Sequence, residues 1–175
     1  MQMKRALALG LLVAGLTASA AATEFRVGFV NIAKLLQDSP QAADASAKIE
    51  QDFSPREREL VSTQKDVRQL EDRLLRDGPG MTDVARGGLE LDVRNRKREL
   101  KRQQDEFRED LNLRKNQELA SIQRIVIEAI QSLAKKEGYD LVLSEGVVFA
   151  SSRVDITDKV LERLKQEAGR RGGGS

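Results

Sequence analysis

The hydrophobic positions at the start of the folded region predict a short strand, a short helix and then a very long helix. Large apolar residues alternate along 25–30, which is the period of a strand, and the apolar positions of 31–37 share one helical face. Ser39 then suits an N-cap and Pro40 a first helical position. We therefore expect a helix from Pro40 to Asp77, with a kink near Pro55, because a proline inside a helix removes one ladder hydrogen bond.

Gly78-Pro79-Gly80 predicts a tight turn, and a second long helix is expected from Asp83 to Lys136. Two long helices joined in this way must be antiparallel neighbours. Their apolar stripe is thin: Leu60, Val67, Leu70 and Leu74 in the first helix, and Val93, Leu100, Phe107 and Leu111 in the second. Packing within the hairpin is the simpler interpretation of this stripe.

The pattern becomes broadly apolar from Leu119 onward, which indicates that this end of the second helix is buried. Tyr139–Ser144 and Val147–Ala150 predict two strands of a hairpin around Glu145-Gly146. Asp155 or Thr157 then caps a last helix, and residues 169–175 predict a flexible tail. Three short strands with little apolar area do not form a stable sheet in one copy, so we expect the body to self-associate.

The predicted fold class is therefore α+β, mainly α, with a small β-strand body and a long antiparallel helical hairpin projecting from it. The expected boundaries are 23–50 and 119–168 for the body, 51–118 for the hairpin and 169–175 for the tail.

Residues 1–22 have the layout of a secretory signal: Lys4 and Arg5, an apolar run over 6–16, then small residues that predict cleavage after Ala20 or Ala22. The alternative is a membrane anchor, but the run is shorter than the ~20 residues needed to span a bilayer. Removing the segment takes away two of the 30 basic residues and none of the 28 acidic ones, so the mature chain carries no net charge. We expect it to work outside the cytoplasm, where there is no ATP.

The composition argues against catalysis. The chain has no His, Cys or Trp, which excludes a histidine base, a thiolate nucleophile and the usual ligands of zinc or iron–sulfur sites. No phosphate-binding glycine motif occurs, and the paired acids on the exposed hairpin have no water-poor pocket to separate their pKa values. We expect no enzyme activity, no cofactor and no metal.

The densest charge cluster is 94–102, with six basic residues and one acid over nine positions. One interpretation is a solvated helix face balanced by Glu90, Asp92, Asp105 and Glu106. The other is a positive inner wall that attracts acidic unfolded chains or anionic lipid headgroups. Nucleic acid is not expected as a partner, because such binders are basic overall or carry stacking aromatics.

Several sequence blocks resemble, in order and spacing, the Skp (OmpH-like) family of periplasmic chaperones. The blocks are Val27-Gly-Phe-Val-Asn31, Leu36-Gln-Asp-Ser-Pro40, Phe53-Ser-Pro-Arg56, Arg76-Asp-Gly78, Gly138-Tyr-Asp-Leu-Val-Leu-Ser-Glu-Gly146 and Val154-Asp-Ile-Thr-Asp158. The resemblance implies a homotrimer whose strands join in a barrel-like body, with three hairpins around a cavity. It implies ATP-independent binding of unfolded outer-membrane proteins in the periplasm, keeping them soluble until they are inserted. It also implies a lipopolysaccharide site on the hairpin; only Arg114 falls on such a basic position, and the others carry Gln103 and Leu113.

The functional hypothesis is thus a periplasmic holdase, and the alternative is a coiled-coil spacer or envelope adaptor with one folded partner. Diffuse contact with unfolded chains or anionic surfaces is expected at Arg94, Arg96, Lys97, Arg98, Lys101, Arg102 and Arg114. Self-association is expected at Val27, Phe29, Ile122, Ile130, Leu141, Leu143 and Val148.

Overall fold

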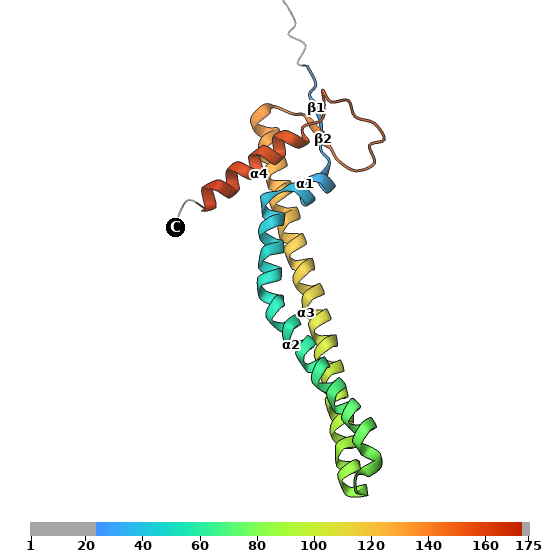
Figure 1. Ribbon diagram of the computed structural model, residues 1–175. Helices are drawn as coiled ribbons and strands as arrows, with labels where there is room; N and C mark the ends of the chain where they lie inside the picture. The colour runs from blue at the N-terminus through green and yellow to red at the C-terminus, as the bar shows by residue number, and fades with distance from the viewer. Residues whose placement is uncertain (1–23, 173–175) are drawn as a thin grey trace, which may run out of the picture.

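A computed structural model describes residues 24–172 and shows a long helical hairpin projecting from a small head (Figure 1). The elements are β1 (Val27–Phe29), α1 (Ile32–Asp38), α2 (Pro40–Asp77), the 3-10 turn η1 (Gly78–Gly80), α3 (Asp83–Glu137), β2 (Leu141–Leu143) and α4 (Thr157–Gly172). The head contains β1, α1, β2, α4 and the adjoining ends of α2 and α3. This confirms the mainly α fold with a small sheet; the predicted signal segment lies outside the described residues.

Local capping explains where the two long helices begin and end. The Ser39 side chain accepts a hydrogen bond from a backbone N–H of the first turn of α2, and Pro40 opens that turn. Thr82 caps α3 in the same way. Gly138 ends α3 with a φ of 70°, a left-handed conformation that favours glycine. The extents of both helices therefore follow the predicted ranges.

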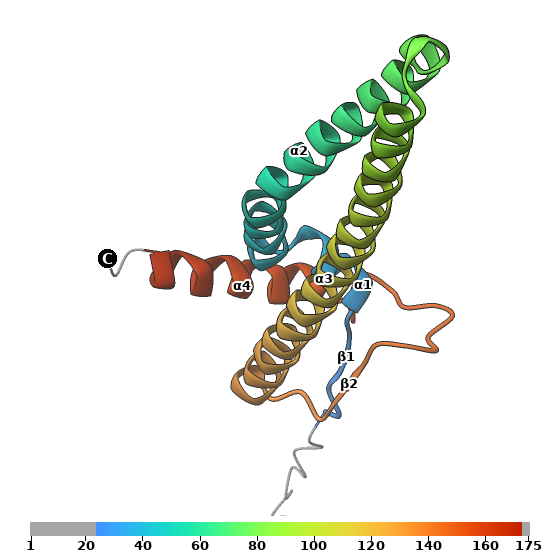
Figure 2. The same cartoon turned by 90° about the horizontal axis from the view of Figure 1, so that it is seen from below.

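α2 bends in its N-terminal half, where the sequence predicts a kink. Pro55 lies inside the helix and has no N–H to donate to the preceding turn. The Ser54 hydroxyl donates instead to the Glu50 carbonyl at 2.5 Å, and such back-bonding bends helices. Figure 2 shows α2 changing direction while α3 runs on without a comparable bend.

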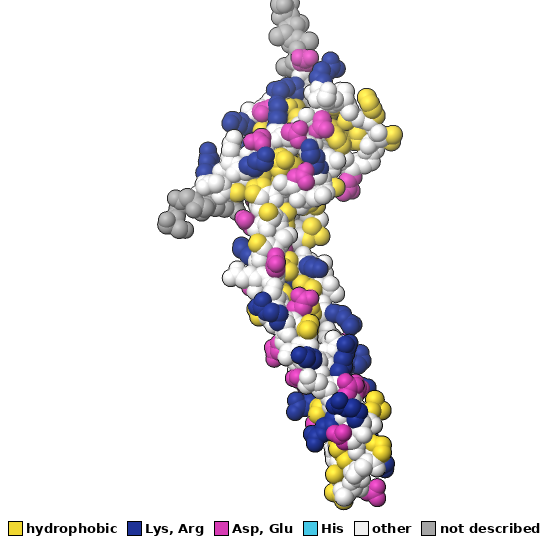
Figure 3. All heavy atoms as spheres, in the orientation of Figure 1, with side chains coloured by type: hydrophobic (Ala, Val, Ile, Leu, Met, Phe, Trp, Pro, Cys, Tyr) yellow, Lys and Arg dark blue, Asp and Glu magenta, His cyan; other side chains and the backbone are white. Residues whose placement is uncertain are grey.

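The thin apolar stripe packs between the two helices, as predicted. Val67, Val93 and Leu100 are buried. The other stripe residues are half-buried: Leu60, Leu70, Leu74, Phe107 and Leu111. On the face shown in Figure 3, charged side chains are distributed along the hairpin, with apolar side chains among them.

The head is held together by segments far apart in the sequence. β1 and β2 are parallel, and their register pairs Val27 with Leu141. On the other edge of β1, the Phe29 N–H donates to the Val154 carbonyl at 2.7 Å and the Phe29 carbonyl accepts from the Ile156 N–H at 2.9 Å. The core beneath consists of Val30, Leu35, Ala45, Ile122, Val126, Ala129, Leu133, Ile156, Val160 and Leu164.

The predicted β-hairpin around Glu145-Gly146 is wrong. β2 pairs with β1, and residues 147–150 form no strand but belong to a loop that projects from the head (Figure 1). Val148 and Phe149 in this loop are 102% and 84% exposed. A strand is stabilised by pairing and packing with neighbouring strands, and within residues 24–172 residues 147–150 pair with no other strand.

The last helix also runs further than predicted. α4 continues through Gly169 to Gly172, so residues 169–172 are helical where a tail was expected. The Asp155 carboxylate accepts a hydrogen bond from the Thr157 N–H at 2.9 Å, while the Thr157 hydroxyl accepts from the Asn31 N–H. Asp155 therefore caps the helix, and Thr157 ties its first turn to the head.

Candidate functional site

The basic run 94–102 lies on α3, and most of its cations contact acids. The ion pairs are Arg94–Glu90 (4.0 Å), Arg96–Asp92 (3.4 Å), Lys101–Asp105 (3.1 Å) and, across the hairpin, Lys97–Glu71 (2.7 Å). Arg102 contacts both Glu99 and Glu106. Arg98 hydrogen-bonds Asn95 and has no acidic partner within residues 24–172. The four acids expected from the sequence to balance this run therefore all contact it: Glu90, Asp92, Asp105 and Glu106.

These ion pairs are exposed, so they exchange readily with solvent and with other charged groups. Hydrogen bonds from Arg102 lower the pKa of Glu99 below its ordinary value of 4.5. The hydrogen bonds to Glu99 and Glu106 raise the pKa of Arg102. Both groups therefore stay ionised at neutral pH, and every cation of the run except Arg98 is paired with an acid. A role for this run in contacting unfolded chains or anionic surfaces stays a prediction.

Arg114 lies higher on α3, between acids of both helices. Its guanidinium contacts Glu118 at 3.0 Å and Asp52 of α2 at 3.8 Å. Gln103 donates to Glu99, and Leu113 is an exposed apolar side chain. Because Gln103 and Leu113 are uncharged, these positions do not form a cluster of basic residues with Arg114.

A cluster of two rings, an arginine and a carboxylate joins α2 to α3 near the bend. We call Phe53, Arg56, Phe107 and Asp110 the aromatic–arginine cluster. The two rings meet edge to face with centroids 5.6 Å apart. The Arg56 guanidinium lies over both rings, at 5.6 and 5.8 Å from their centroids, and its Nη1 is 2.8 Å from Asp110 Oδ2.

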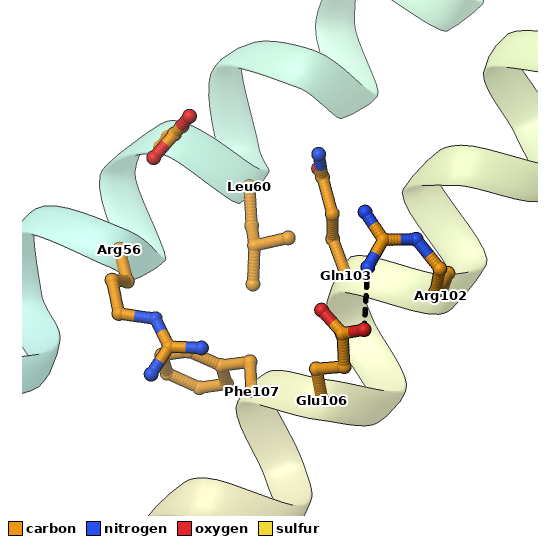
Figure 4. A pocket seen from close by; sticks show the side chains of 7 residues that line it. Arg56, Leu60, Arg102, Gln103, Glu106 and Phe107 are labelled. Carbon is orange, nitrogen blue, oxygen red and sulfur yellow. Dashed lines mark hydrogen bonds and ion pairs between the residues drawn. The ribbon is translucent and has the colours of Figure 1, made fainter.

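An open cleft of about 220 Å³ lies beside this cluster, between the two helices (Figure 4). Leu60 and Phe107 supply its apolar lining, and Arg102 and Glu106 face one another on the α3 side. The side chains at this level therefore leave space between the helices.

The head carries an apolar groove of about 330 Å³ beside β2. Its apolar lining residues are Val30, Ile32, Ile127, Ile130, Ala134, Leu141 and Val142. Among the described residues β2 has a partner on one edge only, and Leu141 and Leu143 each remain 42% exposed. The groove and the open edge of β2 lie side by side, and the exposed loop follows β2 in the chain.

The residues predicted for self-association are distributed unevenly over this region. Ile130 and Leu141 line the groove, Leu143 is exposed beside it, and Val148 is in the projecting loop. Val27 and Phe29 are half-buried in β1, whereas Ile122 is buried in the core of its own chain. Their role in assembly stays a prediction.

Two ion pairs link α4 to the other helices of the head. Lys34 of α1 contacts Asp158 of α4 at 2.8 Å, and Glu137 of α3 contacts Lys159 of α4 at 2.7 Å. The hydrogen bond from Lys34 lowers the pKa of Asp158, and that from Lys159 lowers the pKa of Glu137. Both carboxylates are therefore ionised in the folded head at neutral pH.

The described chain gathers no group of side chains that could hold a metal ion. None of the helices within 24–172 has the length and hydropathy needed to span a membrane.

Sequence reasoning missed the aromatic–arginine cluster and part of the groove. Phe53 lies 25 residues before the tip turn at Gly78, and Phe107 lies 27 residues after its end at Gly80. Similar distances from the turn of an antiparallel hairpin place two residues close to one another, so this spacing could have revealed the contact. Ile32 and Ile127 of the groove gave no comparable signal, because their positions fit a helical core equally well.

Comparison with known proteins places these features in context. The family model described as outer membrane protein (OmpH-like) matches residues 26–164. The chaperone protein Skp of Yersinia enterocolitica is 30% identical over 164 residues, which cover 93% of this chain and 100% of that protein. Skp of Pectobacterium atrosepticum is 30% identical over 158 residues, covering 90% of this chain and 94% of that one. The Skp-like protein of Pseudomonas aeruginosa is 28% identical, covering 86% and 90% of the two chains.

The fold has a solved counterpart as well. The crystal structure of an OmpH-like protein from Caulobacter crescentus CB15 superposes with a TM-score of 0.74, covering 95% of this chain and 90% of that chain at 14% identity. At this identity the likeness establishes the fold alone.

Proposed function

Because the chain belongs to the OmpH-like family of Skp chaperones, we propose that it is an ATP-independent periplasmic holdase for unfolded outer-membrane proteins. It keeps them from aggregating after export and helps to deliver them for assembly in the outer membrane. The observation that carries this proposal is the unpartnered apolar groove on the head, together with a long and sparsely packed hairpin whose surface carries both charged and scattered apolar side chains.

Self-association through the head follows from the same observation. An exposed groove, an open strand edge and an apolar loop are costly to leave in water, and pairing with other copies removes all three at once. In the proposed trimer the three heads join and the three hairpins surround a common space. Val148, Leu141 and Leu143 are the residues expected to be covered.

Contact with the unfolded chain is proposed to be diffuse and to lie on the hairpin, roughly between Arg56 and Lys115. The exposed ion pairs of the basic run can exchange one acidic partner for another at little cost. Many weak contacts of this kind restrain an unfolded chain without fixing one conformation. Enclosure between the hairpins then separates clients from one another, which suppresses their aggregation.

The test is light scattering during dilution of a denatured outer-membrane barrel protein, with and without the mature chain. A holdase suppresses scattering without ATP and forms a soluble complex with the unfolded barrel. The alternative, a spacer or adaptor, would leave the scattering unchanged and form a stoichiometric complex with a native protein. That second result would overturn the proposal.

A further inference from the structure

One face of α3 carries no charge in the half of the helix nearer the head. Residues 83–110 contain 16 charged side chains in 28 positions, whereas residues 112–134 contain five in 23. Spacings of three and four residues, which follow one face of a helix, connect a set that is entirely uncharged. We call this set the uncharged stripe: Asn112, Asn116, Ala120, Gln123, Ile127, Ile130 and Ala134, with Leu113, Leu119 and Gln131 on its borders.

The uncharged stripe is open to solvent along most of its length and joins the groove on the head. Leu113, Leu119 and Ile127 are exposed apolar side chains, and amide side chains are exposed between them. At the head end, the stripe residues from Ile127 onward line the groove beside β2. Toward the tip, the next residue on this face is the charged Glu109.

The composition of the stripe does not suit packing against another helix. A coiled-coil seam has an apolar residue at two of every seven positions, which requires about six or seven over this length. Residues 112–134 expose only three large apolar side chains. Most of the other stripe residues are Asn or Gln, whose amides donate and accept hydrogen bonds. Such a surface suits a partner whose backbone N–H and C=O groups are unpaired, as they are in an isolated extended segment.

The length and the lack of charge indicate what kind of extended segment fits. The stripe is about 33 Å long at the helical rise of 1.5 Å per residue. A strand that crosses the outer membrane has about 9–11 residues, and at ~3.3 Å per residue it extends over roughly 30–36 Å. The membrane-facing side chains of such a strand are apolar. They can therefore pack on the stripe without removing water from a charged group.

We propose that the uncharged stripe holds a membrane-spanning strand of the unfolded client in extended form, in preference to the polar loops of that client. Apolar side chains of the strand pack on Leu113, Leu119 and Ile127, while Asn116 and Gln123 hydrogen-bond to its backbone. The basic run nearer the tip contacts the charged remainder of the same client. This inference rests on the proposed function, and it adds a binding site and the class of segment that binds there.

A charge of either sign at Gln123 tests the stripe. The residues three and four positions away from Gln123 are all uncharged, so Gln123→Glu and Gln123→Lys create no ion pair with them. Both variants of the mature chain are expected to bind a denatured outer-membrane barrel protein about fivefold more weakly, because the added charge loses water without gaining a partner. Gln117→Glu and Gln117→Lys are the matched controls and are expected to keep the wild-type affinity. Gln117 is also exposed, but it lies about 120° around the helix from Gln123, outside the stripe.

Cross-linking identifies the segment that is bound. Since the chain has no cysteine, Gln123→Cys carries a single benzophenone label, and Gln117→Cys carries the control label. Mass spectrometry of the cross-linked barrel protein is expected to place the products of Gln123→Cys in its membrane-spanning strands. The products of Gln117→Cys are expected to be fewer and to show no preference for strands.

Four results would overturn the proposal. The first is equal affinity of the Gln123 and Gln117 variants, and the second is opposite effects of Gln123→Glu and Gln123→Lys, which would indicate attraction between charges. The third is cross-linking of Gln123→Cys to loops as often as to strands. The fourth is dissociation of the assembled chain by Gln123→Glu, which would show that a sister copy covers the stripe. In all four cases the wild type can still suppress scattering, whereas loss of that suppression would overturn the proposed function itself.

Discussion

Val148→Asp is the sharpest test of assembly through the head. Val148 is 102% exposed in the single chain. If the assembly covers it, about 2 kcal/mol of hydrophobic burial per copy is lost on substitution, before the cost of desolvating a carboxylate is added. A trimer contains three such contacts, so the loss reaches ~6 kcal/mol. The dissociation constant then rises by roughly four orders of magnitude.

The assay is the mass of the mature chain in solution over a range of concentrations, by sedimentation or light scattering. Val84→Asp is the matched control, because Val84 is 88% exposed but lies near the tip, far from the head groove. We expect Val148→Asp to dissociate at concentrations where the wild type and Val84→Asp remain assembled. The reasoning is refuted if Val148→Asp keeps the wild-type mass throughout, or if Val84→Asp dissociates equally.

Three further predictions follow from named contacts. Gly28→Ala is expected to destabilise the head by about 1–2 kcal/mol in a denaturant titration, since its Cβ would lie 2.9 Å from the buried Ile156. Gly88→Ala is expected to stabilise helix α3 by about 1 kcal/mol in the same titration, because a Cβ there would meet no atom within 4 Å. The hydrogen bond from Lys34 lowers the pKa of Asp158 below its ordinary value of 3.8. The ion pair therefore stabilises the head fully above pH 3.8, and this stabilisation is lost as the pH falls through the pKa of Asp158 in the folded state. Asp158→Asn should therefore reduce the loss of stability on acidification, and an unaltered pH profile would contradict the assignment. If the basic run helps to capture acidic clients, the association rate constant falls from low to high salt, because exposed charges are screened over about 8–10 Å at physiological ionic strength. A salt-independent rate constant would exclude that role.

The hairpin could be predicted from sequence because its determinants are local. Ser39, Thr82 and Gly138 mark helix ends through contacts within a few residues. The seven-residue spacing of Val93 and Leu100 then places the seam.

The head could be predicted only in part, because its contacts are remote in sequence. The strand at Leu141–Leu143 was expected, but its parallel partner β1 lies more than a hundred residues earlier. The alternation of Val147–Ala150 fits a strand, yet a strand requires neighbours, and no short-range pattern says whether the chain supplies them. The aromatic–arginine cluster escaped notice for a related reason: the contacts of Arg56 with Phe107 and Asp110 become visible only when the two helices are aligned about the tip.

The parallel pairing of β1 with β2 has a consequence for the order of events during synthesis. The hairpin joins residues that are near one another along the chain and can form early, whereas the head core needs Val30 and Leu35 to meet Ile156, Val160 and Leu164. An incomplete polypeptide that lacks α4 can therefore form the hairpin but not the complete core of the head. The head whose surface is proposed to recognise sister copies is therefore completed only after α4 has been synthesised, so a product truncated before α4 lacks a complete surface for joining finished copies.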